Sequence, residues 1–415
     1  MTSSSFNLLE LKLHFWLEAK SGNITELRKL YQTSVALNVT LEIINVQNGR
    51  GLSALSVAIL IGNIETAEYI IDIGADVNVA TSEKDIGFAC NTPLIEASGL
   101  GYLSLVNKLI ERGAKINATS EDGTHALYLA AQNGYFDIVK ILVEKDPNVT
   151  DLRGYLGRTP LMVAAKNGHL GIVKYFMSLP LTNINSQDND ENTPLIWAAF
   201  NNHSKIVENL LENGANTSVK DAGGNTALYW STQLGYINIV KLLAEKDPSD
   251  ANIIGFKGRT PLITAAQKGY LDIVKYLSSL PQNKIDSQDD DGNTALMLSI
   301  ANNHLNIVQF LVLREVDPNS KNDQGQTPLI TAAMRGFLNI ANYISSLPQV
   351  NIDAQDNFGV TALGWASYNN HPDIVEHLLK RGANLSIKDS FGKTAFDWAT
   401  SQNHNDVIEM FEKYS

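Results

Sequence analysis

Histidine and cysteine are the first residues to test for chemistry in this sequence, which contains eight histidines and a single cysteine. Zinc needs ligands at about 2.0–2.3 Å, whereas helices packed side by side lie roughly 10 Å apart. The histidines that recur once per repeating segment are therefore predicted to be structural rather than metal ligands or catalytic groups. They are His169, His203, His304, His371 and His404.

Catalytic and cofactor motifs are absent from the sequence. It contains no HExxH, no GxxxxGK[ST] and no GxSxG, and Gly99-Leu100-Gly101 lacks the third glycine of a dinucleotide fingerprint. Cys90 has no activating base that the sequence identifies. We therefore expect a protein that is not an enzyme and needs no metal or cofactor.

Charge and hydropathy narrow the classes of partner and compartment. A net charge of −12 argues against nucleic-acid binding. No apolar run reaches the ~18 residues of a membrane span, and the N-terminus lacks the pattern of a secretory signal. A lone cysteine suits a reducing compartment. We expect a cytoplasmic monomer without membrane insertion, and nuclear or host-cell delivery remains open.

The elements that position these residues recur along the chain. Thr193–Gly224 reads as one unit: Thr-Pro opens a helix, Asn202 ends it, and a second apolar helix from Lys205 to Leu211 ends at Gly214. From Thr92 onward, openers follow every 33 or 34 residues. The first step is longer because of extra residues in Ala80–Cys90, where we expect an exposed loop. The openers are Ser53, Thr92, His125, Thr159, Thr193, Thr226, Thr260, Thr294, Thr327, Thr361 and Thr394.

A longer repeat period of 101 residues is superimposed on the period of 33 or 34 residues. The segments opened by His125, Thr159 and Thr193 return 101 residues later, and the last two types recur once more at Thr327 and Thr361. Duplication of a three-unit block explains this pattern. Either the duplication is history alone, or it repeats one binding surface for an extended partner.

The period of about 33 residues, with openers such as Thr159-Pro160-Leu161 and closing elements such as Gly74-Ala75-Asp76, resembles the ankyrin repeat. The resemblance implies an all-α, ankyrin-type solenoid of stacked helix-turn-helix units, curved into a superhelix of about twelve units. We predict a degenerate N-terminal capping repeat and connection at 1–52, a repeat array at 53–393 and a C-terminal capping repeat at 394–415.

In ankyrin-like units the turn tips and first helices line a concave face, and such faces are the usual binding surfaces. Large aromatic residues in polar turns are therefore candidate anchors for a partner. The alternative is that each ring folds onto the neighbouring turn. These residues are Phe88, Tyr155, Phe256, Phe358 and Phe391.

Four of the five tryptophans share one position, four residues after an opener: Trp197, Trp230, Trp365 and Trp398. Phe200 and Tyr368 lie near them on first helices. Two interpretations remain open for the tryptophans, packing between repeats and partly exposed anchors in the groove.

Acidic turn residues form a further candidate set: Asp188, Asp190, Asp289, Asp290 and Asp291. They are either a solvated turn or a negative rim that steers a basic partner. No EF-hand spacing supports calcium.

These patterns predict a scaffold or adaptor that binds a partner protein through its concave face. The resemblance implies protein–protein recognition without naming the target. The alternatives are the substrate-recognition subunit of a modifying complex, such as a ubiquitin ligase, and a host-directed effector.

Overall fold

The computed structural model describes residues 7–49, 51–81 and 90–414, and α-helices dominate them. The chain divides into two compact units, Met1–Asn216 and Thr217–Ser415. Phe88 and most of the predicted loop lie outside the described residues. The domain boundaries predicted at 53 and 394 stay predictions.

The first unit consists of successive helix pairs with a short third helix near the N-terminus. Its elements are α1 (Leu8–Ser21), α2 (Ile24–Ala36), α3 (Thr40–Ile44), α4 (Ala54–Ile61), α5 (Ile64–Asp72), α6 (Pro93–Leu100), α7 (Leu103–Glu111), α8 (Ala126–Asn133), α9 (Phe136–Lys145), the 3₁₀ turns η1 (Pro147–Asp151) and η2 (Tyr155–Gly157), α10 (Pro160–Lys166), α11 (Leu170–Met177), α12 (Pro194–Phe200) and α13 (Ser204–Glu212).

The second unit repeats this plan. Its elements are α14 (Ala227–Gln233), α15 (Ile237–Lys246), η3 (Pro248–Asn252), η4 (Phe256–Gly258), α16 (Pro261–Lys268), α17 (Leu271–Ser279), α18 (Ala295–Ala301), α19 (Leu305–Leu313), α20 (Pro328–Arg335), α21 (Leu338–Ser345), α22 (Ala362–Tyr368), α23 (Pro372–Lys380), α24 (Ala395–Ser401) and α25 (Asn405–Tyr414). Isolated β-bridges join Gln47 to Ser53, Thr119 to His125 and Gln355 to Thr361.

The openers act as helix N-caps, as their sequence predicts. The Thr193 hydroxyl accepts the Ile196 amide at 3.2 Å, and Pro194 occupies the first turn of α12, where no amide hydrogen is needed. Asn202 adopts the left-handed conformation expected after that helix, with φ of 62°. Gly168 has φ of 85°, and a Cβ there would lie 2.7 Å from the His203 ring of the following repeat. Glycine is therefore required for both conformation and packing.

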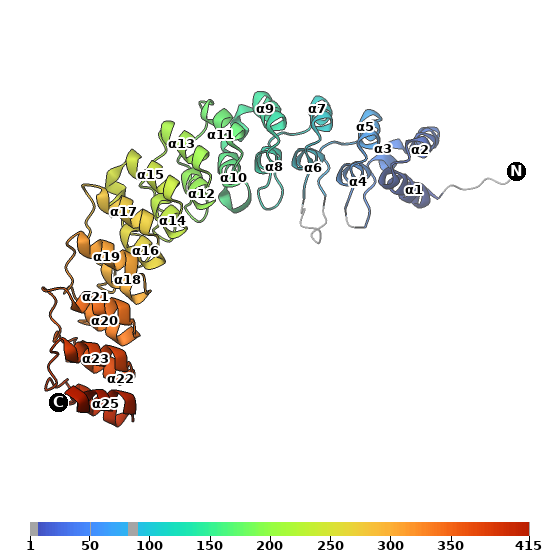
Figure 1. The fold of residues 1–415 in the computed structure, drawn as a ribbon. Helices are drawn as coiled ribbons and strands as arrows, with labels where there is room; N and C mark the ends of the chain where they lie inside the picture. Colours follow the sequence, from blue (N-terminus) through green and yellow to red (C-terminus); the bar gives the residue numbers. More distant parts are fainter. Residues whose placement is uncertain (1–6, 50, 82–89, 415) are drawn as a thin grey trace. The chain divides into compact units, whose positions relative to one another are not determined.

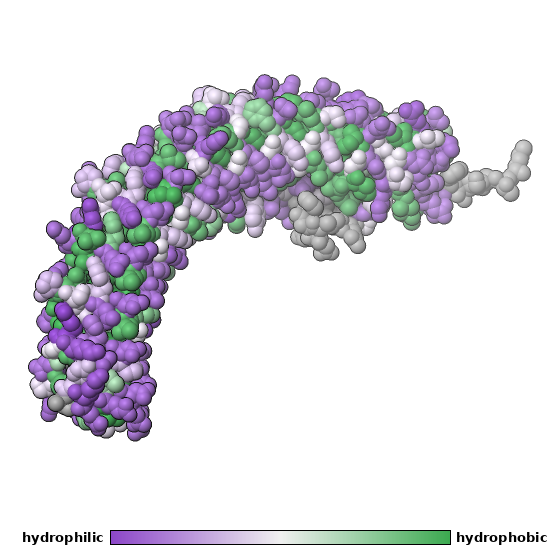
Figure 2. Space-filling model, in the orientation of Figure 1, coloured by the Kyte–Doolittle hydropathy of each residue, from purple (hydrophilic) through white to green (hydrophobic). Residues whose placement is uncertain are grey.

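Within each of the two units, successive helix pairs pack against one another. In the first unit, α4, α6, α8 and α10 contact one another in sequence, and so do α5, α7 and α9 (Figure 1). In the second unit, α16, α18, α20, α22 and α24 do the same. Small buried residues such as Ala198 and Ala199 allow the close approach. Figure 2 shows polar side chains over most of the visible surface, with apolar ones scattered among them.

Two parts of the fold differ from the sequence prediction. The connection predicted within 1–52 contains a short helix, Thr40–Ile44, because Ile43 and Ile44 are buried. The predicted polar turns near Tyr155 and Phe256 contain 3₁₀ turns, of which Asp146 caps η1 and Asp247 caps η3 through their side chains. The tips of η2 and η4 carry Leu156 and Lys257 with positive φ.

Candidate functional site

The four tryptophans after the openers share one hydrogen bond. Each indole N–H donates to the aspartate nine residues earlier, in the turn before its helix. Each aspartate therefore holds the orientation of one tryptophan ring. The pairs are Trp197–Asp188 at 2.9 Å, Trp230–Asp221 at 2.6 Å, Trp365–Asp356 at 2.7 Å and Trp398–Asp389 at 2.6 Å.

The second carboxylate oxygen of each aspartate organises the turn itself. Asp356 Oδ1 accepts the amides of Phe358 and Val360, both at 2.9 Å. Asp389 Oδ1 likewise accepts the amides of Phe391 and Lys393, both at 2.9 Å. One carboxylate thus holds both a turn-tip phenylalanine and a helix tryptophan.

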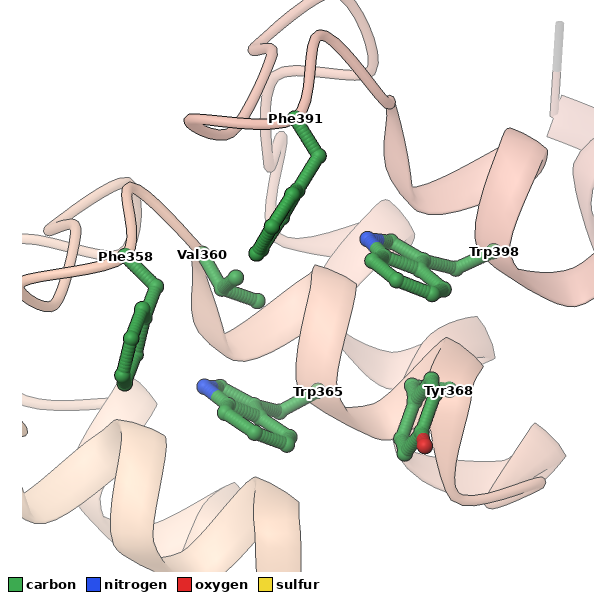
Figure 3. Close-up of a pocket in the computed structure, with 6 residues that line it drawn as sticks. All are labelled: Phe358, Val360, Trp365, Tyr368, Phe391 and Trp398. Atoms are coloured by element: carbon green, nitrogen blue, oxygen red, sulfur yellow. The ribbon is translucent and has the colours of Figure 1, made fainter.

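These two pairs of rings meet in a pocket of about 310 Å³ (Figure 3). Its lining comes from two successive turns and the helices that follow them, α22 and α24. We call it the aromatic pocket. It is lined by Phe358, Val360, Trp365, Tyr368, Phe391 and Trp398.

The rings of the aromatic pocket pack edge to face. The Tyr368 ring stands at 88° to Trp365 with centroids 5.9 Å apart, and at 90° to Trp398 with centroids 5.1 Å apart. Phe391 meets Trp398 at 85° and 6.3 Å. Such pairs are favourable beyond their buried area. Phe391 nevertheless stays 68% exposed and Phe358 54% exposed, so the pocket presents preorganised aromatic surface to solvent.

The other aromatic candidates lie elsewhere. Tyr155 and Phe256 are exposed on η2 and η4, but neither lines the aromatic pocket. Trp197 and Phe200 pack edge to face at 6.3 Å, as Trp365 and Tyr368 do. Trp230 is half-buried beside Tyr229. The structure therefore joins Phe358, Phe391, Trp365, Trp398 and Tyr368 in one pocket, and the other described aromatic candidates do not line it.

The acidic set also separates into two groups. Asp188 and Asp289 do not lie on a rim, because they are only 5% and 7% exposed. Their Oδ2 atoms pair with Nε of Arg158 and Arg259 at 3.3 Å and 3.2 Å. Asp188 and Asp289 are buried because their carboxylates organise the turns in which they lie. Asp190, Asp290 and Asp291 are exposed, and their attraction for a basic partner stays a prediction.

Sequence reasoning missed the aspartates at 221, 356 and 389 as positioning residues. It also missed Val360 and the arginines that precede Thr159 and Thr260. A signal for the aspartates was present, because the same Asp-to-Trp spacing of nine residues occurs four times. This spacing was hard to recognise because each aspartate lies in a polar turn whose other residues vary between repeats.

The histidines connect successive repeats. The ring N–H of His169 donates to the Gln132 carbonyl at 2.9 Å, that of His203 to Lys166 at 3.0 Å, and that of His304 to Gln267 at 3.1 Å. These bonds confirm the structural role predicted for these three. Within residues 7–49, 51–81 and 90–414, no group of three or more His, Cys, Asp or Glu side chains is arranged to hold a metal ion.

One buried acid stands where other repeats have tryptophan. Glu96 lies four residues after its opener and is 3% exposed on α6. Neither carboxyl oxygen has a hydrogen-bond partner among the described residues, and Ser56 faces it from α4 outside hydrogen-bond geometry. Burial raises the pKa of Glu96 well above its ordinary value. Its carboxyl group is therefore best accommodated in the neutral form.

Comparison with known proteins places the whole array in one group. A family model described as ankyrin repeats, three copies, matches overlapping stretches from 15–120 to 344–414. The chain is 30% identical over 150 residues to the B-cell lymphoma 3 protein homolog of Mus musculus, covering 36% of this chain and 31% of that protein. It is 39% identical over 75 residues to the human ankyrin repeat and KH domain-containing protein 1, covering 18% of this chain and 3% of that protein.

A plant protein shares a shorter stretch. The probable E3 ubiquitin-protein ligase XBOS33 of Oryza sativa subsp. japonica is 37% identical over 71 residues, covering 17% of this chain and 14% of that protein. These alignments span less than a third of each relative's own length. In the described part of the chain, no helix has the length and apolar character needed to cross a bilayer.

Proposed function

Because this chain belongs to the ankyrin repeat family, whose arrays are generally protein-interaction modules, we propose that it is a scaffold that binds a partner protein. The partner docks on the side formed by turn tips and first helices, with the aromatic pocket as its anchor. The protein acts by binding rather than catalysis, as a monomer in a reducing compartment such as the cytoplasm.

The observation that supports this proposal is the aromatic pocket itself. Two indoles, each held by an aspartate, and an edge-packed tyrosine form surface whose side chains are already ordered before binding. A partner that docks there loses little additional side-chain entropy from these rings. Aromatic residues in well-packed pockets are typical binding hot spots.

A pair of matched variants tests the proposal. Phe391→Ala removes an aromatic-pocket residue, and Phe256→Ala removes a turn-tip phenylalanine of similar exposure outside the pocket. Crosslinking in cells followed by mass spectrometry identifies proteins held by the wild type, and titration with the purified partner measures affinity. We expect Phe391→Ala to raise Kd by about 30-fold, the scale of a hot-spot residue.

Phe256→Ala is the control variant, and we expect it to bind the partner with the affinity of the wild type. Equal affinities of the wild type and the two variants for the partner, with unchanged circular dichroism, would show that the partner does not bind at the aromatic pocket.

A second candidate function is substrate recognition for a ubiquitin ligase. The similarity to XBOS33 favours it, although the aligned 71 residues cover only 14% of that protein. In this case the chain binds a ligase subunit as well as a client. Ubiquitination of the captured client in a reconstituted reaction, dependent on this chain, supports the candidate, and its absence removes it.

A further inference from the structure

Three equivalent places in the chain can be compared, and each lies where a repeat opened by Thr159, Thr260 or Thr327 meets the next repeat. At the first two, an arginine directly precedes the opener. Arg158 pairs with Asp188 and Arg259 pairs with Asp289, and in both cases the carboxylate side chain is fully buried. The arginine supplies the positive charge that a buried carboxylate requires.

At the first place the same arginine also covers a tryptophan. The Arg158 guanidinium lies 4.6 Å from the Trp197 ring centroid, and the Lys166 ammonium lies 4.6 Å from the same centroid. Cations within about 6 Å of an indole are attracted by its quadrupole. The chain therefore supplies its own cations to this ring.

The third place has the aspartate and the tryptophan but lacks both cations. Gln326 occupies the position of Arg158, and Met334 occupies the position of Lys166. The Gln326 amide accepts from Asn322 and donates to Met334 Sδ instead of reaching Asp356. Among the described residues, no cation lies over Trp365 and no ion pair involves Asp356.

Asp356 is thus a carboxylate only 6% exposed, with the Trp365 N–H as the hydrogen-bond donor to its Oδ2. Directly beside it, Trp365 faces the open aromatic pocket (Figure 3). A buried negative charge next to exposed aromatic faces favours a cation that can leave water cheaply. Guanidinium is such a cation, because it is planar, weakly hydrated and stacks on aromatic rings.

We propose that the aromatic pocket receives an arginine side chain of the partner protein, whose guanidinium stacks on Trp365 as Arg158 stacks on Trp197. This inference rests on the proposed function and names the chemistry of the same site. The pocket volume of about 310 Å³ suits one long side chain rather than a folded element.

Lys393 does not take this place. Its ammonium lies 3.9 Å from the Trp398 centroid, but Lys393 is not among the residues that line the aromatic pocket. Trp197 accommodates two cations beside one carboxylate. A partner arginine on Trp365 next to Lys393 on Trp398 would set two cations against two carboxylates, those of Asp356 and Asp389, which hold the two indoles.

Two peptides provide the ligand test: acetyl-Gly-Arg-Gly-amide and its citrulline counterpart, which keeps nearly the shape of arginine but is uncharged, because a carbonyl oxygen replaces one guanidinium nitrogen. Binding is followed through the indole N–H signals of Trp365 and Trp398 in NMR spectra of the full-length protein. We expect the arginine peptide to shift the Trp365 signal and to bind roughly tenfold more tightly than the citrulline peptide.

Substitution of Gln326 provides the protein test. Gln326→Arg is expected to rebuild the contact of Arg158 within the chain and to lower affinity for the arginine peptide at least tenfold. Gln326→Leu is the matched control, which loses the same amide bonds without adding a charge and is expected to keep binding. Circular dichroism verifies that both variants fold.

The outcomes separate this inference from the proposed function. Equal binding of the two peptides, or full binding to Gln326→Arg, would show an apolar docking site without arginine selectivity and would overturn this inference alone. Absence of any peptide binding also overturns it. The proposed function is judged separately, by the affinity of Phe391→Ala for the whole partner.

Discussion

The hydrogen bond between Trp365 and Asp356 permits a quantitative test of how the aromatic pocket is positioned. The bond is 2.7 Å long, involves a charged acceptor, and lies where Asp356 is 6% exposed. Hydrogen bonds to charged groups contribute about 1.5–3 kcal/mol. We therefore expect Asp356→Asn to reduce the free energy of unfolding by about 2 kcal/mol.

The geometry explains why asparagine is a sharp probe. Its Oδ1 can still accept the amides of Phe358 and Val360, so the turn is preserved. Its Nδ2 would instead face the Trp365 N–H, which places two donors against each other. Trp365→Phe removes the indole donor and leaves the Asp356 oxygen unpartnered. In the double variant this donor conflict is absent.

A double-mutant cycle isolates the interaction. Urea unfolding of the wild type, the two single variants and the double variant gives the four free energies, and hydrogen exchange in α20–α24 verifies that the loss is local. We expect a coupling energy of at least about 1 kcal/mol. Asp289→Asn with Leu298→Ala is the control, since Leu298 replaces tryptophan there and offers no donor. Additive effects of Asp356→Asn and Trp365→Phe would refute the assignment of Asp356 as the positioning residue.

Three further expectations concern buried groups. The pKa of Glu96 is raised in the folded state, so the folded protein binds more protons than the unfolded chain above about pH 4.5. The free energy of unfolding therefore falls with rising pH by about 1.4 kcal/mol per unit up to the folded pKa. Glu96→Gln should abolish this slope in urea titrations, and an unchanged slope would contradict the assignment to Glu96. Burial lowers the pKa of His125 to about 4, so its contribution to the free energy of unfolding is complete above about pH 6.5 and is lost as pH falls through 4, by about 3 kcal/mol. His125→Asn keeps the helix cap and should remove this loss of stability at low pH. If the stabilities of the wild type and the variant instead change in parallel with pH, His125 is not the titrating group. Leu262→Ala, at a site 1% exposed, should cost about 2–5 kcal/mol and raise hydrogen exchange in α16–α18 while leaving α4–α9 protected; uniform loss of protection would argue against nearest-neighbour stability.

The sequence predicts the repeated helix pairs well because their signals are local. Threonine caps the amide three residues ahead, proline fits the first turn, and glycine or asparagine accepts the left-handed conformation. The short helix at Thr40–Ile44 was missed because it is stabilised by burial rather than by periodicity. The 3₁₀ turn at Pro147–Asp151 was missed because a side-chain cap and burial stabilise it.

The candidate site was predictable only in part. The shared tryptophan position and the turn-tip phenylalanines were recognisable from spacing, and the structure brings Phe358, Phe391, Trp365 and Trp398 together. The acidic turns were not interpretable in the same way. Asp188 and Asp190 lie two residues apart in one polar segment, yet one is buried on Arg158 and the other is exposed.

By itself, the sequence determined the repeat period, the helix pairs and the position of each tryptophan, because these depend on contacts within a few residues. Only the tertiary structure decided what each tryptophan does. Trp197 and Trp365 occupy the same place in their repeats, but Arg158 and Lys166 cover the first, while Gln326 and Met334 leave the second facing an open pocket. The difference comes from the preceding repeat, more than 30 residues away in the chain, which reaches the indole only when the repeats stack.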